Sequence, residues 1–550
     1  MNDELAEVLF PDIKNSKEYY ESKYPSRNLE EKAIVTRSAP SPTGFVHLGN
    51  IYQSFLVSRF AKQTKGVCFL RIEDTDQKRE VENGIEKIIK DLNSFDINFD
   101  EYPKNENEEI GSYGPYIQSK RKEIYQTFAK YFVEKGLAYP CFCSQEDLEN
   151  IRKVQEEKKE RIGYYGKWAV CRQIKTEDAI KRIKSGDKWV LRLKSNGSFN
   201  NKVDINDLIK GNLELPENDM DIVIIKSDGL PTYHFAHLVD DYLMHSTHII
   251  RADEWLSSLP LHTQLFNMLG VKPPKYAHIS PLSKIEGTSR RKLSKRKDPE
   301  FAASFYDEKG IPKEALRIYL LTIANSNFEA WYNSNPNKDI NEFELTFNKM
   351  SSSDILFDLE KLINISRNYI SRLKSEKVYE EAYKWAEKYD NEYKDLLDKY
   401  KEYSIKIFNV EREKAKPRKD YDYYSHIKEQ TWYMYDELFN TRDKDYEFNT
   451  ISDTNEIKLI LNTYINKYFD ITNDQIWFDK VKDLSEDLGY AREVKDYKDN
   501  PDKYKGHVGD ISMVLRVALT TKSMTPNLYD IFNLLGKEKV LERFNLLINK

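Results

Sequence analysis

The feature that most constrains this chain is a strand–turn–helix–strand pattern between residues 33 and 74. The apolar run AIVTR ends at Arg37, and the PSPTG stretch that follows holds two prolines, which cannot continue a strand, and a glycine, which permits a tight turn. A segment with apolar residues at helical spacing, LGNIYQSFLVSRFAK, then precedes a second apolar run, VCFLRIED. This order predicts a βαβ unit.

Four apolar runs in the first half of the chain each end in polar or charged residues: AIVTR (33–37), VCFLRIED (67–74), DIVIIKSDGLPTYH (221–234) and THIIRADEW (247–255). Near-continuous apolar runs are typical of parallel strands buried on both faces. Ligands of such sheets bind beyond the carboxyl ends of the strands. Arg37, Glu73, Tyr233 and Arg251 stand at or just beyond such ends. Strand ends are also often polar because they reach solvent, so for any one residue both interpretations stay open.

The PSPTG turn and the helix after it predict an anion site. A helix N-terminus offers unpaired N–H groups and a positive dipole end, which favour a phosphate. His47 adds a donor there, and Gly49, which lacks a side chain, lets a flat base lie against the backbone. The plainer alternative is a capped helix whose histidine is satisfied locally.

A second basic feature is RRKLSKRK (290–297), in which six of eight residues are basic. Such a run is most often a solvated face or a general phosphate patch. Here it follows the strand-like YAHISPL (276–282), which puts lysines near the same sheet edge as the His47 helix. Lysine, a flexible point charge, suits the spreading negative charge of a triphosphate.

Together these motifs resemble a known family. PSPTGFVHLGN (40–50) is similar to the HIGH region of class I aminoacyl-tRNA synthetases in the form used by the bacterial-type glutamyl-tRNA synthetases, and KLSKR is similar to their KMSKS loop. The likeness covers essentially the whole chain from about residue 33, through RIEDTD, YGPYIQSKR, GLAYPCFC, GLPTYHFAHLVDD, IIRADEWLSSLPLH and LRVALTT. It implies a glutamate–tRNA ligase that activates L-glutamate with ATP to glutamyl-adenylate and transfers glutamate to the 3′-terminal adenosine of tRNA(Glu).

The resemblance also implies roles for single residues. Those implied for glutamate are Arg37, Ser41, Glu73, Tyr233 and Arg251. Those implied for ATP are Pro40, Ser41, Pro42, Thr43, Gly44, His47, Gly49, Asn50 and Lys295, with His47, Lys292 and Lys295 catalytic. Glutamate carries two carboxylates and one ammonium, so two cations and one anion balance it. Family members often have asparagine where this chain has His237.

The resemblance implies that Mg2+ accompanies ATP. Magnesium usually relies on phosphate oxygens and water, and we assign no metal-binding residue. Cys141, Cys143 and Cys171 resemble a zinc site of some family members, in which a histidine two residues after the third cysteine completes four ligands. This chain has Gln173 there. Because a structural zinc ion takes four ligands, we expect an incomplete or lost site.

The implied fold is a Rossmann-type α/β catalytic domain (33–120 and 216–280) with an inserted α+β domain for the tRNA acceptor end (121–215), which is too long for a simple crossover. Residues 281–370 would hold the KMSKS loop and contact the tRNA stem. Residues 371–550 are rich in Lys, Glu and Tyr and have apolar residues at helical spacing, which predicts a mostly α-helical region. The resemblance implies that this region is the anticodon-binding domain. Residues 1–32 form an N-terminal extension. Trp432 and Tyr433 could stack bases, but in a helix such residues are more often core.

Composition sets further limits. No run of about 18 apolar residues occurs, so no membrane span is expected. Four cysteines and an acidic N-terminus without a signal core predict a cytoplasmic location. A net charge of −5 means that tRNA would have to meet local basic patches. A monomer, the family's usual form, is expected.

Three alternatives remain to be weighed. Glutaminyl-tRNA synthetases have a different HIGH-region surround and a β-rich C-terminal part. A shortened paralogue that glutamylates a modified tRNA base lacks the anticodon module. A catalytically inactive synthetase-like RNA-binding protein would have no reason to keep His47, Lys295, Arg37, Arg251 and Glu73. The sequence leaves open whether tRNA(Gln) is also charged and which residues read the anticodon.

Overall fold

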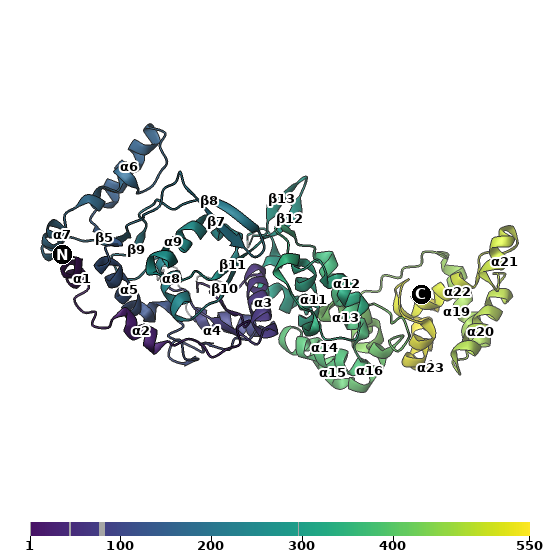
Figure 1. Ribbon diagram of the computed structural model, residues 1–550. Coiled ribbons are helices and arrows are strands. Elements are labelled where there is room, and N and C mark those ends of the chain that lie inside the picture. Colours follow the sequence, from purple (N-terminus) through teal and green to yellow (C-terminus); the bar gives the residue numbers. More distant parts are fainter. Residues whose placement is uncertain (1, 43–45, 76–82, 295, 550) are drawn as a thin grey trace. The chain divides into compact units, whose positions relative to one another are not determined.

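The computed structural model describes residues 2–42, 46–75, 83–294 and 296–549 (Figure 1). The chain divides into two compact units. Unit 1 comprises Met1–Ala303 and Leu320–Asp358, and unit 2 comprises Ser304–Tyr319 and Leu359–Lys550.

Two pairs of parallel strands form the part of unit 1 that the sequence predicts to be a parallel sheet. β1 (Val35–Ser38) pairs with β2 (Val67–Leu70), and β10 (His248–Ala252) pairs with β11 (Lys275–Ile279). The helix α3 (Leu48–Gln63) joins β1 to β2, which confirms the predicted βαβ unit. The Thr247 N–H donates to the Val35 C=O at 2.9 Å, so β10 begins beside β1. This is the Rossmann-like sheet that the sequence predicts.

A hairpin extends the second strand pair. β7 (Lys202–Asp207) and β8 (Gly211–Pro216) are antiparallel, and β7 pairs with β11, which gives the strand order β10-β11-β7-β8. Asp207, the last residue of β7, lies opposite Tyr276 of β11. The hairpin therefore brings a buried carboxylate to the edge of β11.

One predicted strand has a different partner. The run 221–234 contains β9 (Val223–Ile225), which pairs antiparallel with β6 (Val190–Leu193) in the sheet β5-β6-β9 and not with the parallel strands. β5 (Ala138–Cys141) completes this sheet. An apolar run indicates that a strand is buried but does not identify its neighbour, which explains why the sequence misplaced it.

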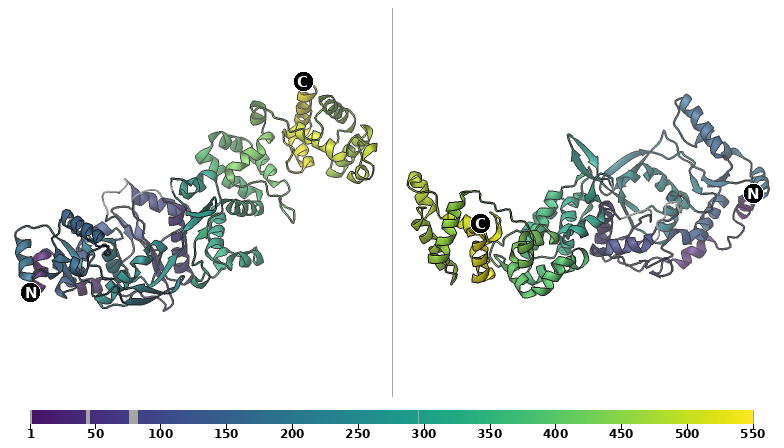
Figure 2. Two further views of the ribbon diagram at one scale, coloured as in Figure 1. Left: turned by 90° about the horizontal axis from the view of Figure 1, so that it is seen from above. Right: turned by 180° about the vertical axis from the view of Figure 1, so that it is seen from behind.

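Helices lie beside these sheets (Figure 2). α5 (Lys122–Glu134) and α8 (Tyr233–Leu243) pack on each other and supply much of one hydrophobic core. The N-terminal extension belongs to the same core, because α1 (Asn2–Leu9) packs on α5 and α7 (Thr176–Lys184), and α2 (Lys17–Lys23) packs on α5. The extension is thus a structural part of unit 1.

The remaining elements of unit 1 are α4 (Gly84–Asn93), β3 (Tyr102–Pro103), β4 (Glu109–Ile110), α6 (Gln145–Glu157), α9 (Leu259–Leu269), β12 (Leu282–Glu286), β13 (Ser289–Lys292), α12 (Phe328–Ser334) and β14 (Ile355–Leu356). Short 3-10 helices include η2 (Gln118–Arg121), η4 (Val170–Gln173) and η5 (Asp253–Ser258). α10 (Ala303–Lys309) and α11 (Lys313–Ala324) lie where the chain passes between the two units.

Unit 2 is helical, as the sequence predicts. Its helices are α13 (Leu359–Arg372), α14 (Ser375–Tyr389), α15 (Asn391–Lys399), α16 (Lys401–Asn409), α17 (Tyr424–Thr431), α18 (Asp436–Thr441), α19 (Thr454–Thr463), α20 (Asp474–Asp487), α21 (Val494–Asp499), α22 (Val508–Thr520) and α23 (Leu528–Ile548). Trp432 and Tyr433 are buried in its core, so the plainer interpretation of these aromatic residues is correct. Within the described ranges, no helix has both the length and the apolar character needed to cross a membrane.

The packing of the N-terminal helices can be tested at Phe10, which is buried with its ring edge-to-face on Trp189. Phe10→Ala removes this apolar contact and leaves a cavity, so we expect unit 1 to lose about 3–5 kcal/mol of unfolding free energy. Differential scanning calorimetry of the full chain measures the shift. Tyr19→Ala, at a half-exposed ring of α2, is the control and should change stability by less than about 0.5 kcal/mol. Equal shifts for the two variants would contradict the packing role.

Candidate active site

His47 is the N-cap of α3, one residue before the helix begins. Its Nδ1 accepts the backbone N–H of Asn50 at 3.2 Å, and the Asn50 Oδ1 accepts the backbone N–H of His47 at 3.2 Å. A neutral imidazole with Nδ1 as acceptor carries its proton on Nε2. The ring therefore caps the helix with one nitrogen and keeps a donor on the other.

Gly49 leaves space for this arrangement. A Cβ atom at Gly49 would lie 3.0 Å from Cε1 and 3.1 Å from Nδ1 of His47, so a side chain there would push the imidazole away from the helix end. The ring of Phe301 stacks on His47 with centroids 4.5 Å apart. The glycine and the phenylalanine together fix the imidazole at the N-terminus of α3.

The rest of the turn is described only in part. Thr43 and Gly44 lie outside the described residues. The side chain of Ser41 is exposed and Pro42 is buried. The Pro40 C=O accepts the backbone N–H of Glu73 at 3.1 Å, which ties the turn to the segment after β2.

Arg37, at the end of β1, is buried and ion-paired. Its Nε donates to Oδ1 of Asp241 on α8 at 3.0 Å, and Nη1 of Arg71 donates to the same oxygen at 3.2 Å. Burial would raise the pKa of Asp241, but Arg37 and Arg71 outweigh it and hold this pKa well below its usual range. Asp241 is therefore a carboxylate that fixes the guanidinium of Arg37.

The neighbouring carboxylate on α8, Asp240, shares Arg71 with Asp241, at 3.5 Å from Nε of Arg71, and has three further partners. Its oxygens accept from Nε of Arg121 at 2.7 Å, from Nε2 of Gln118 at 2.9 Å and from the hydroxyl of Tyr125 at 2.9 Å. All four side chains are buried. Asp240 thus joins α8 to η2 and α5.

Glu73 lies beyond the end of β2, and its Oε1 accepts from Nη2 of Arg71 at 3.1 Å. Burial raises the pKa of Glu73, an effect that Arg71 and Arg37 partly oppose. Arg71, which the sequence analysis did not select, thus binds Glu73 and Asp241 together. The only local signal for Arg71 in the sequence was its place in RIED, two residues before Glu73.

Arg251, at β10, is held by neutral groups. Its Nε donates to Nε2 of His278 at 3.0 Å, and Nη1 lies 3.5 Å from the hydroxyl of Tyr233. The Tyr233 ring stacks on Trp255 with centroids 4.1 Å apart. Across the described parts of the chain, no carboxylate forms an ion pair with Arg251, which is 2% exposed.

His278 is itself oriented by Asp207, whose Oδ2 lies 2.7 Å from Nδ1 of His278. Because Nε2 accepts from Arg251, Nδ1 carries the proton and the ring is neutral. Burial lowers the pKa of His278, which agrees with the neutral form. Burial would raise the pKa of Asp207, but hydrogen bonds from His278 and from the backbone outweigh it and lower this pKa.

His237, where family members often have asparagine, is fully buried with both ring nitrogens occupied. Nδ1 lies 2.5 Å from Oδ2 of Asp241, and Nε2 lies 3.0 Å from the hydroxyl of Tyr276. Burial lowers the pKa of His237 to about 3. The neutral ring therefore donates to Asp241 and accepts from Tyr276.

Four predicted residues come together at the strand ends. Burial raises the pKa of Glu73, and Arg37 opposes this rise. Burial also raises the pKa of Tyr233, which Arg251 and Arg37 lower and Glu73 raises. These side chains thus share one electrostatic environment. The four side chains are two cations, one anion and one hydroxyl, and Arg71 and Asp241 contact them. Such groups can bind a small ligand with carboxylates and an ammonium.

The basic motif forms a hairpin and a loop. β12 and β13 are antiparallel, and Asp298 accepts two hydrogen bonds from Arg291, at 2.7 and 2.9 Å, and one from the Ser294 N–H at 2.8 Å. Lys292 ends β13 and pairs with Glu254 of η5 at 2.9 Å, where both side chains are exposed. Lys295 lies outside the described residues.

Comparison with known families defines the class. The family profile described as tRNA synthetases class I (E and Q), catalytic domain, matches residues 33–364. A second profile, described as an anticodon binding domain, matches residues 421–548. The chain belongs to the class I tRNA synthetases of the E and Q group.

Individual proteins agree with this class. The chain is 49% identical over 546 residues to the glutamate–tRNA ligase of Acetivibrio thermocellus, covering 99% of both chains. It is 47% identical over 541 residues to that of Clostridium perfringens, covering 98% of both chains. A crystal structure of a glutamate tRNA ligase from Elizabethkingia meningosepticum in complex with its amino acid has a TM-score of 0.74 and 26% identity, over 94% of this chain and 100% of that chain.

The role of Asp241 can be tested by removing its charge. Asp241→Asn leaves Arg37 and Arg71 with one negative partner fewer, so we expect a loss of about 3–5 kcal/mol of unfolding free energy at pH 7. The control is Asp204→Asn at an exposed position of β7, expected to change less than about 0.5 kcal/mol. Similar stability of both variants at pH 7, measured by chemical denaturation, would contradict this role.

The same variant has a predicted pH dependence. The folded pKa of Asp241 is depressed, so its contribution is fully present above the unfolded value of about 4 and is lost as pH falls from there toward the folded pKa. The stability difference between wild type and Asp241→Asn should therefore be constant above about pH 5 and shrink below about pH 4.

Proposed function

We propose that this chain is a glutamate–tRNA ligase, which activates L-glutamate with ATP and transfers the glutamyl group to tRNA(Glu). The observation that carries the proposal is the cluster of Arg37, Glu73, Tyr233 and Arg251 at the strand ends of unit 1. Similarity over 98–99% of the length of glutamate–tRNA ligases supports the same conclusion.

In this proposal the two arginines bind the two carboxylates of glutamate, Glu73 binds its ammonium group, and the hydroxyls of Tyr233 and Ser41 complete the contacts. Arg251 suits an incoming carboxylate, because the described groups that hold its buried guanidinium, His278 and Tyr233, are neutral. Glu73 is fixed for its task by Arg71.

ATP binds along the turn and the start of α3. The proposed contacts are Pro40, Ser41, Pro42, Thr43, Gly44, His47, Gly49, Asn50 and Lys295. His47 carries a donor on Nε2 because its Nδ1 caps the helix. Lys292 and Lys295 stabilise the negative charge that builds up on the phosphates.

The reaction then needs no nucleophilic side chain. The α-carboxylate of glutamate attacks the α-phosphorus of ATP in line, the bond to the bridging oxygen breaks, and pyrophosphate leaves. A ribose hydroxyl of the tRNA 3′-terminal adenosine next attacks the acyl carbon, and AMP leaves. Positioning and charge stabilisation supply the rate.

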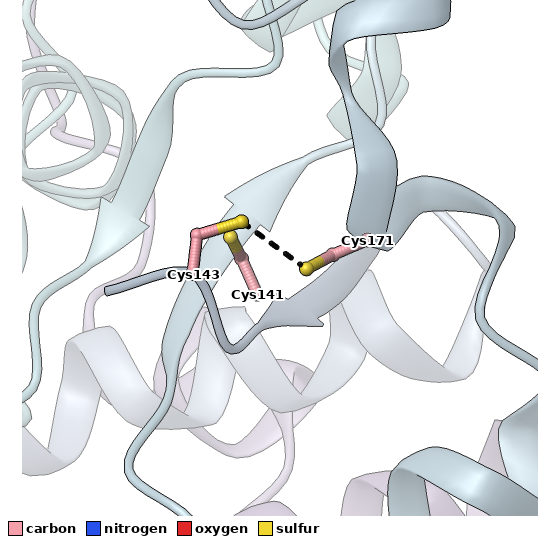
Figure 3. Close-up of side chains that lie close together, drawn as sticks. All are labelled: Cys141, Cys143 and Cys171. Carbon is pink, nitrogen blue, oxygen red and sulfur yellow. Dashed lines mark hydrogen bonds between the residues drawn. The ribbon is translucent and has the colours of Figure 1, made fainter. Parts of the chain in front are cut away.

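Mg2+ is proposed to enter with ATP. The one group of three or more potential metal ligands among the described residues consists of Cys141, Cys143 and Cys171 (Figure 3), three cysteines that do not suit Mg2+. This ion would therefore be held by phosphate oxygens and water and would neutralise phosphate charge.

The proposal extends to the tRNA and to the domains. Residues 121–215 bind the acceptor end, 281–370 the stem, and 371–550 the anticodon, of which 421–548 match an anticodon-binding profile. The enzyme acts as a monomer in the cytoplasm, where its four free cysteines stay reduced. The helical unit 2 disfavours a glutaminyl-tRNA synthetase, whose C-terminal part is β-rich.

The test is aminoacylation by the purified chain. We expect pyrophosphate exchange that requires glutamate, ATP and tRNA together, with charging of tRNA(Glu). Parallel reactions with tRNA(Gln), and with glutamine in place of glutamate, distinguish the dual-specificity and glutaminyl alternatives. Absence of exchange with every tRNA would support the inactive RNA-binding alternative and contradict the proposal.

The catalytic lysine gives a second prediction. Lys295→Ala removes the positive charge that stabilises the phosphates in this proposal. Adenylate formation should therefore fall by about a hundredfold or more, while tRNA binding stays close to wild type. Lys297→Ala, an exposed lysine of the same loop, is the matched control and should affect both far less. An equal loss of tRNA binding and adenylate formation in Lys295→Ala would contradict the assigned role.

A further inference from the structure

The N-terminal extension contributes an arginine to the interior of unit 1. Arg27 follows α2, and its guanidinium donates to both carboxylate oxygens of Glu101, from Nη1 at 2.7 Å and from Nη2 at 2.8 Å. Its Nε donates to the backbone C=O of Met244 at 3.0 Å. The side chains of Arg27 and Glu101 are 7% and 12% exposed. A bidentate pair of this kind fixes both the distance and the orientation of its two groups.

Aromatic rings pack on the same guanidinium. Its central carbon lies 3.8 Å from the centroid of the Tyr113 ring and 5.9 Å from that of Phe69 on β2. The Tyr113 hydroxyl donates to the Pro25 C=O at 2.8 Å, and the Tyr24 hydroxyl donates to the Gly114 C=O at 2.6 Å. The extension therefore binds the loop before η2 through several contacts as well as through the ion pair.

Glu101 and Tyr116 hold the chain where β2 ends. The Glu101 C=O accepts the backbone N–H of Leu70 at 2.9 Å, and the Tyr116 C=O accepts that of Ile72 at 2.8 Å. The side chains of the two residues are also joined, because the Tyr116 hydroxyl donates to Oε2 of Glu101 at 2.8 Å. Arg27 thus binds the carboxylate that links both of these residues.

The backbone held in this way carries two side chains of the candidate site. Arg71 and Glu73 flank Ile72, and their N–H groups donate to the C=O groups of Ser38 and Pro40 at 3.0 and 3.1 Å. Successive N–H groups of an extended segment point to opposite sides. Residues 70–73 are therefore fixed on one side by the end of β1 and on the other by the residues that Arg27 binds.

We propose that Arg27 is a positioning residue for glutamate binding. Through Glu101 and Tyr116 it holds residues 70–73, and with them the Glu73 carboxylate that receives the ammonium group of glutamate. This inference rests on the proposed function, which gives Glu73 that role. A displacement of about 1 Å in a group that positions a substrate can cost about a hundredfold in rate, so the support of this segment matters to the reaction.

The test is pyrophosphate exchange by the full chain with tRNA(Glu), with glutamate and ATP varied in turn. Arg27→Ala should raise the KM for glutamate about tenfold or more and change the KM for ATP less than about twofold, because the proposed ATP contacts lie on the turn and α3. Arg27→Lys keeps the charge but not the two parallel hydrogen bonds, so it should restore only part of the loss. Lys32→Ala, at an exposed basic residue of the same extension, is the matched control and should behave as wild type does.

A double-mutant cycle tests the route of the effect. Glu101→Gln should also raise the KM for glutamate. If Arg27 acts through Glu101, combining Arg27→Ala with Glu101→Gln should raise this KM by much less than the product of the two single effects. Independent, multiplying effects would contradict the proposed route.

Hydrogen exchange followed by mass spectrometry gives a measurement that needs no reaction. In Arg27→Ala, the amides of residues 70–73 should exchange about tenfold faster or more, while peptides of unit 2 exchange as in wild type. If Arg27→Ala does not fold, Arg27→Lys and Tyr116→Phe, which removes one hydroxyl, decide the question by the same two measurements.

Three results would overturn the proposal. These are an unchanged KM for glutamate, an equal rise in the KM values for glutamate and ATP, and unchanged hydrogen exchange at residues 70–73. Failure of the proposed function looks different, because the wild-type chain would then show no pyrophosphate exchange with any tRNA while the hydrogen-exchange difference could still be measured.

Discussion

The arrangement of unit 1 depends on two adjacent buried carboxylates of α8, Asp240 and Asp241. Successive residues of a helix point about 100° apart, so each carboxylate reaches partners that the other does not. Asp241 pairs with Arg37 at β1, Asp240 pairs with Arg121 of η2, and Arg71, just after β2, pairs with both. Removing one member of a buried ion pair is costly because the other stays charged and desolvated. The ion pairs therefore fix the positions of α8, β1, β2 and η2 relative to one another.

This network gives the candidate site its asymmetry. Arg37 is fixed by a carboxylate, whereas Arg251 is fixed by the neutral imidazole of His278, which Asp207 orients from β7. A neutral partner positions a guanidinium without cancelling its charge. The β7–β8 hairpin thus contributes to the site through the hydrogen bonds that join Asp207 to His278 and His278 to Arg251.

The sequence predicted the parts of this molecule that depend on local order. The βαβ unit and the helical unit 2 were predicted correctly, since periodicity reports local geometry. The same signals could not identify Arg71 or Asp241, because their importance lies in contacts with residues about 170 positions away. They also placed β9 in the wrong sheet, since the apolar character of a strand does not indicate which strand it pairs with.

By itself, then, the sequence determined which segments form strands and helices, which family the chain belongs to, and which residue types could meet glutamate and ATP. Tertiary structure alone decided that His47 caps α3 through Nδ1, that Arg251 is held by His278, and that Arg27 binds Glu101. The physical reason is that the residue type alone fixes which functional group a side chain carries. Its protonation, orientation and partners depend on groups that only the folded chain brings within hydrogen-bonding distance.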